Sequence, residues 1–208
     1  MLVRLAVLAL AAAACRAPRS ALPVDPGVTF AAHRDGDGFV VDRTRAGEAG
    51  VLAARGRLHD PDAPNLVLRV GDEARAGLWI VGRTRVLARD GTDNRGPRAG
   101  EVLSAWDAGA IRLTLYPRSG APLETDTFRA VGGRVLARSG SVSGTYRAAL
   151  RDANGAEVGW LRVDAGAPGA PRAYDAVLPE RVDDAVAAAA TAALDAELSW
   201  IAEHGAGN

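Results

Sequence analysis

Thr145-Tyr-Arg-Ala-Ala-Leu-Arg-Asp-Ala-Asn154-Gly155-Ala-Glu-Val-Gly-Trp-Leu-Arg-Val-Asp164 is the stretch of the chain that decides its fold class. The Asn-Gly pair at its centre tolerates the positive φ angles of a tight turn, and both flanks have the character of short strands. On the second flank, Val158 and Trp160 share one face of an extended chain, and the other face includes Leu161 and Val163. The stretch therefore predicts a β-hairpin.

Short runs of the same character recur along the chain from residue 28 and are separated by turn residues. The clearest alternation places Ile111, Leu113 and Leu115 on one face of a strand. Many short strands of this kind indicate an antiparallel barrel or sandwich, and the pattern leaves the choice between the two open. The predicted strands are residues 28–32, 38–42, 50–58, 65–70, 77–83, 85–89, 101–106, 110–116, 127–130, 133–138, 145–152 and 157–164, with a further extended run at 174–178.

A long helix is predicted at the C-terminal end, over residues 179–204. Pro179 suits the first position of a helix, and His204 followed by glycine suits its last turn. Apolar residues recur there at spacings of four and three and form one stripe: Val182, Val186, Ala190, Leu194, Leu198 and Ile201. Most acidic residues lie off this stripe, so we expect Asp195 on a polar side. The predicted fold is mainly β, with this helix packed on or in the barrel or sandwich.

The first 14 residues indicate a signal peptide. A single positive charge, Arg4, precedes an uncharged run of leucine, alanine and valine, which is too short for a permanent membrane span. The run ends at Ala12-Ala13-Ala14-Cys15, and Cys15 is the only cysteine of the chain. The segment resembles a bacterial lipoprotein signal, which implies that Cys15 carries lipid. The alternative is ordinary cleavage after the alanines, which would give a soluble periplasmic or secreted protein.

Residues 15–27 are rich in proline and predict a tether between the lipid and a single domain at residues 28–204. Arg16, rather than aspartate, after the cysteine fits the rule by which lipoproteins reach the outer membrane. We therefore expect a membrane-anchored protein that faces the periplasm, with the outer membrane favoured. Several acyl chains would hold such a domain firmly, because each buried methylene contributes about 0.8 kcal/mol.

The charge balance excludes one broad class of function. Basic and acidic residues number 25 each, and every basic residue is arginine. Nucleic-acid binding needs a basic excess that displaces phosphate counterions, so we expect no nucleic-acid partner. One cysteine cannot form an internal disulfide, and an oxidising compartment adds nothing to stability through that route.

Candidate chemical sites in the sequence favour structural roles. The histidines, His33, His59 and His204, are far apart, and we expect neither a metal nor a cofactor. Residues 140–144 resemble a nucleophile elbow, but Val142 stands where that motif needs serine. Aspartate-rich loops at 35–38 and 90–94 could hold calcium, although they lack its usual spacing and are typical of turns.

Two groups of side chains leave more than one interpretation open. Arg83, Arg85 and Arg89 could meet anionic lipid head groups, although a solvated outer face is favoured. The aromatic residues could fill the core or line a ligand cup in a barrel mouth, and the core is favoured. They are Trp79, Trp106, Tyr116, Phe128, Tyr146 and Trp160.

The region 128–204 is similar to the end of tubby-like barrels, which include the LURP-one and scramblase relatives. Their Asp-x-x-Gly-x-x-Val turn corresponds here to Asp152, Gly155 and Val158, followed by an extended run at 172–178 and the helix. In that family a nearly all-apolar helix threads the barrel, whereas this predicted helix carries six acids. The resemblance implies lipid or membrane-linked binding and no catalysis.

Together these patterns predict an envelope-anchored lipoprotein that acts as a non-catalytic binding or structural module. Its expected partners are the membrane, through lipid on Cys15, and a lipid or another envelope protein. The alternative is an envelope hydrolase whose acidic residues converge only in the fold.

Overall fold

A computed structural model of the chain describes residues 27–55, 62–137, 142–166 and 170–205. The predicted signal peptide, Cys15 and all of the tether but its last residue lie outside the described residues. His59 and the first two residues of the elbow-like segment, 140–141, also lie outside them.

The described chain forms one large antiparallel sheet. Its strands are β1 (Phe30–Asp35), β2 (Gly38–Arg43), β3 (Gly50–Ala54), β4 (Leu66–Val70), β5 (Glu73–Val81), β6 (Arg85–Asp90), β7 (Arg98–Asp107), β8 (Ala110–Pro117), β9 (Leu123–Thr125), β10 (Arg129–Ala130), β11 (Thr145–Arg151), β12 (Glu157–Asp164) and β13 (Ala173–Val177). The predicted strand at 133–138 is wrong over its described residues, 133–137, because these make isolated bridges only. The three-residue strand β9 was not predicted.

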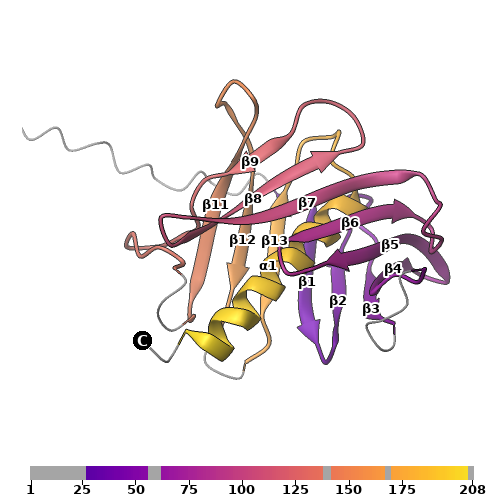
Figure 1. Ribbon diagram of the computed structural model, residues 1–208, viewed down its shortest axis with the longest axis horizontal. Coiled ribbons are helices and arrows are strands. Elements are labelled where there is room, and N and C mark those ends of the chain that lie inside the picture. The colour runs from indigo at the N-terminus through magenta and orange to yellow at the C-terminus, as the bar shows by residue number, and fades with distance from the viewer. Residues whose placement is uncertain (1–26, 56–61, 138–141, 167–169, 206–208) are drawn as a thin grey trace, which may run out of the picture.

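The sheet closes on itself as a twelve-stranded barrel (Figure 1). Each of the strands β1 to β8 pairs with the next strand in sequence, and β13 pairs with β1, which joins the last strand to the first. The remaining gap is closed at β11, where β9 pairs with Leu150 and Arg151 and the two-residue β10 pairs with Tyr146 and Arg147. The fold is therefore a barrel and not a sandwich.

The predicted hairpin and strand alternation are confirmed. Strands β11 and β12 pair in antiparallel register. Thr145 lies opposite Asp164 at one end of the pair, and Arg151 lies opposite Glu157 at the turn. In the turn, Gly155 has a φ of +79°. The Asp152 carboxylate accepts hydrogen bonds from the backbone N–H groups of Asn154 and Ala156, each at 2.9 Å. In β8, Ile111, Leu113 and Leu115 are fully buried and point inward.

Helix α1 (Asp184–His204) begins five residues later than predicted. Asp183 is the N-cap, and its carboxylate accepts a hydrogen bond from the Val186 N–H at 3.1 Å. Pro179 lies instead in a turn closed by the Val182 N–H and the Pro179 carbonyl, 2.9 Å apart. The Arg45 guanidinium donates to the Leu178, Pro179 and Val182 carbonyls and so holds this turn in place. An aspartate cap outweighs the preference of proline for the first position.

The helix is enclosed by protein over most of its length. Every residue from Ala185 to Asp195 is buried, although residues in such a run point in all directions around a helix. Figure 1 shows α1 between β5–β7 and the strands of the opposite wall. At the entry to β7, Gly100 allows close approach, because a Cβ there would overlap Val186. Length and composition alone would let α1 cross a membrane, but most of it is buried in the barrel.

The expectation of a polar helix side at Asp195 is therefore wrong. Asp195 is 6% exposed and Glu197 is fully buried. Apolar periodicity identifies the positions that must be buried, but it assumes that the remaining positions face water. Inside a barrel that assumption fails, and acidic side chains at those positions need partners in the wall.

Candidate functional site

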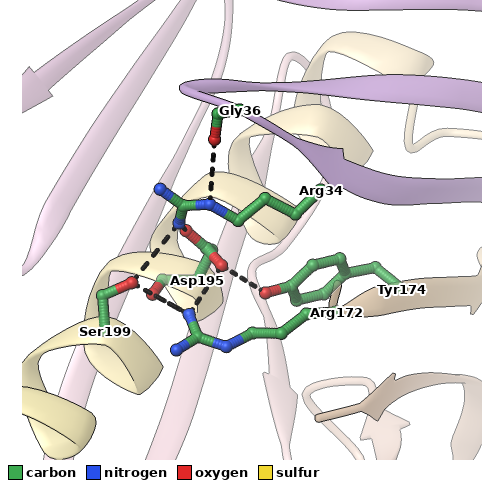
Figure 2. A network of polar contacts seen from close by, with 6 residues as sticks. All are labelled: Arg34, Gly36, Arg172, Tyr174, Asp195 and Ser199. Atoms are coloured by element: carbon green, nitrogen blue, oxygen red, sulfur yellow. Dashed lines mark hydrogen bonds and ion pairs between the residues drawn. The ribbon is translucent and has the colours of Figure 1, made fainter. Parts of the chain in front are cut away.

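Buried and partly buried polar side chains gather around Asp195 in the C-terminal half of α1 (Figure 2). We call this group the Asp195 cluster; it comprises Asp195, Ser199, Arg34 of β1, Tyr174 of β13 and Arg172, which directly precedes β13. The Asp195 carboxylate accepts hydrogen bonds from the Tyr174 hydroxyl at 2.6 Å and from Arg172 at 2.9 Å. It also forms an ion pair with Arg34. The cluster thus ties the helix to the seam between β13 and β1.

The Asp195 cluster keeps the phenol of Tyr174 neutral. Two guanidinium groups flank one buried carboxylate. Their attraction to it offsets the free-energy cost of removing its charge from water. Burial raises the pKa of Tyr174 well above its usual value, and the negative charge of Asp195 acts in the same direction. Tyr174 therefore stays protonated at neutral pH and serves as a hydrogen-bond donor.

Ser199 is the hydroxyl of this cluster, and its surroundings do not activate it as a nucleophile. It lies one helical turn after Asp195 and accepts hydrogen bonds from Arg172 at 2.9 Å and from Arg34 at 3.4 Å. A guanidinium group stays protonated in proteins and cannot remove the proton of a serine. The geometry of Ser199 is that of a structural acceptor.

A second group, the Glu197 cluster, binds the helix to the opposite wall. The Glu197 carboxylate accepts hydrogen bonds from the Ser104 hydroxyl at 2.6 Å and from the Trp106 indole N–H at 3.0 Å, both on β7. Arg83 supplies the nearest positive charge, with its Nε 3.6 Å from the carboxylate. The Arg83 guanidinium also lies over the Trp200 ring, 4.5 Å from its centroid. Both buried acids of α1 are thus neutralised from the barrel wall.

The space beside the helix is largely filled by side chains. One cavity between α1 and the strands β12 and β13 measures about 10 Å³, enough for a single water molecule. It is lined mainly by Leu161, Tyr174, Ala176, Ala187, Ala190 and Leu194. A small organic ligand needs some hundreds of cubic ångströms, so this cavity does not fit one.

Among the described residues, His33, His204 and the aspartate-rich loops singled out in the sequence stay apart. His33 pairs with Asp42 on the barrel exterior at 2.9 Å, and His204 stacks on Trp200 at the end of α1. Within the described ranges no three metal-ligating side chains come together. Residues 35–38 form the turn between β1 and β2, and Asn94 of the 90–94 loop donates a hydrogen bond to Asp62.

The arginines and aromatic residues take several roles. Arg85 pairs with Glu101, and Arg89 donates to the Gly96 carbonyl. Phe128 and Tyr146 belong to the core. Trp160 is also buried, but its position between the inward-facing neighbours Leu161 and Gly159 places it on the outer face.

Sequence reasoning did not identify Arg34, Arg172 and Tyr174 as partners of Asp195, nor Ser199 as a member of the cluster. Arg34 and Asp195 are separated by 161 positions, and only closure of the barrel through β1 and β13 brings them together. No protein-family model, curated protein or solved structure matches this chain.

Proposed function

We propose that the protein is an envelope-anchored lipoprotein whose barrel is a non-catalytic binding or structural module. The observation that carries this proposal is the position of the sole cysteine, Cys15, at the end of an apolar signal-like run. The fold is compatible with it, because a filled barrel leaves binding to the outer surface and the two ends. The outer membrane is the favoured location.

The resemblance to tubby-like barrels is part of the same proposal. Two features of the fold support it: a closed twelve-stranded antiparallel barrel, and a C-terminal helix that is buried on all sides between Ala185 and Asp195. The two buried acids that distinguish this helix from an apolar one, Asp195 and Glu197, are each matched by arginines of the wall or beside it. Membrane-linked binding is the function that such a relationship would imply.

The buried polar groups give the hydrolase alternative little support. A serine nucleophile needs a neighbouring base and contact with its substrate. Ser104 has a carboxylate neighbour in Glu197, but both residues are buried and a substrate would not reach them. Ser199 has guanidinium neighbours that cannot act as bases.

Lipid labelling of the full chain tests the proposal. Cells fed radioactive palmitate should label the wild-type protein, which should sediment with membranes. Cys15→Ser should abolish the label and either accumulate precursor or release soluble protein. An unlabelled wild-type protein in the soluble periplasmic fraction would contradict the anchored model. Arg16→Asp then tests the choice of membrane, because it should retain labelled protein in the inner membrane.

A further inference from the structure

Three arginines stand side by side on the outer face of the barrel. Arg129 of β10 is the register partner of Arg147 of β11, and Arg147 is the partner of Arg162 of β12. Each lies between residues of the barrel core, so its side chain points outward. We call these residues the arginine row. Its next position, on β13, is Asp175.

The charges of the arginine row are only partly compensated. The Nε and Nη2 of Arg162 both donate to Asp175, at 2.8 and 2.5 Å. Among the described residues, Arg129 and Arg147 form neither an ion pair nor a hydrogen bond through their guanidinium groups. Asp164 lies on β12 opposite Thr145, and its carboxylate accepts from the Gly166 N–H. Two adjacent positive charges thus remain without an acid.

Trp160 orients the row. The Arg147 guanidinium lies 4.6 Å from the centre of the indole ring and the Arg162 guanidinium lies 5.6 Å from it. Stacking holds a planar guanidinium in place and leaves its N–H edge free to bind, so less side-chain freedom is lost on binding. The Trp160 side chain is itself 97% covered, in part by these arginines.

The adjacent positive charges of Arg129 and Arg147 lower the stability of the protein, and a bound anion would offset this loss. Like charges directly opposite each other on neighbouring strands are destabilising. Other described arginines, such as Arg34, Arg85 and Arg89, have a carboxylate or carbonyl partner. The Arg129–Arg147 pair differs from them in this respect. Two adjacent guanidinium forks match an oxyanion that carries two charges, because each fork donates two parallel N–H groups.

We propose that the arginine row binds a phosphate group in its doubly charged form, as free phosphate or as the phosphate monoester of a membrane head group. Arg129 and Arg147 supply the charge, and Trp160 positions Arg147. This site is independent of the Cys15 anchor and would persist in a soluble form of the protein.

Calorimetric titration with inorganic phosphate tests the site in the full chain carrying Cys15→Ser. Chloride at equal ionic strength is the reference for non-specific screening. Saturable binding should weaken about ten-fold in Arg129→Gln and in Arg147→Gln, because each variant removes a charge-assisted contact. Arg147→Lys should restore part of the loss, since it keeps the charge without the fork. The control is Arg112→Gln, which removes an exposed outer-face arginine paired with Asp107.

The outcomes separate the two sources of phosphate. Co-sedimentation with phosphatidylcholine vesicles that contain phosphatidic acid, lost in the same two variants, assigns the site to a head group. Phosphate binding without vesicle binding assigns it to a free phosphate compound. Absence of saturable phosphate binding, or equal weakening in Arg112→Gln, overturns the proposal. Unchanged circular dichroism in each variant shows that the comparison concerns binding and not folding.

Discussion

Asp195 joins three elements of the fold through a single carboxylate. Its oxygens accept hydrogen bonds from Tyr174 of β13 and from Arg172, which precedes that strand. They also form an ion pair with Arg34 of β1. Removing this acceptor would leave a buried hydroxyl and two guanidinium groups without their partner. Asp195→Ala should therefore lower the free energy of unfolding by about 3 kcal/mol, as when one partner of a buried ion pair is deleted.

Urea denaturation of the purified protein measures this effect of Asp195→Ala. The matched control is Glu203→Ala on the same helix, because Glu203 is exposed and should tolerate the change within about 0.5 kcal/mol. Equal midpoints for the two variants would show that the Asp195 cluster contributes little to stability.

Asp184, at the start of α1, gives the protein a specific pH dependence. Burial raises its pKa above the usual carboxyl value, and the hydrogen bond from the Arg45 N–H opposes this only in part. The folded protein thus holds this proton more tightly than the unfolded chain. The stability contributed by Asp184 is present below its unfolded pKa and is lost as the pH rises through the raised folded value.

Asp184→Asn should remove this contribution to the pH dependence. The free energy of unfolding, measured by urea denaturation from about pH 3 to about pH 7, should then fall less with rising pH than in the wild type. The matched control is Asp37→Asn, because Asp37 is exposed. Asp152→Asn would be unsuitable, because the Asp152 carboxylate accepts a backbone hydrogen bond in a turn. A curve for Asp184→Asn that parallels the wild type would contradict the assignment.

At the scale of the element, α1 is the core of the barrel. Leu198 is fully buried, and Val186, Leu194 and Ile201 are also covered. Each such aliphatic side chain contributes about 1.5–3 kcal/mol on burial, so the set is comparable to the whole stability of a domain, about 5–15 kcal/mol. Truncation after Leu178 should therefore unfold or aggregate the strands.

Leu198→Asp should reproduce much of the effect of truncation, because it places an unpaired charge between the helix and the wall. Circular dichroism and thermal melting measure both variants against Glu203→Ala. A truncated protein that keeps its β spectrum and melts at the wild-type temperature would show that the barrel does not need α1.

At the scale of the whole molecule, local sequence patterns predicted most of the strands. The closure of those strands into a barrel did not follow from the same patterns. The alternation of Ile111, Leu113 and Leu115 depends on neighbours in sequence, and it was readable. The three-residue β9 is too short to show a period. The arginine row depends on the register of three strands, and the Asp195 cluster depends on the pairing of β13 with β1. A short window of sequence contains neither piece of information.

The placement of α1 inside the barrel also bears on when the protein can fold. The helix is made after all of the described strands, and β13, which completes the wall beside β1, is made just before it. A nascent chain therefore lacks both the helix that fills the barrel and the last strand of its wall until the rest of the barrel has been synthesised. For a chain exported as we propose, this order of synthesis keeps the precursor open enough for translocation and defers assembly to the far side of the membrane.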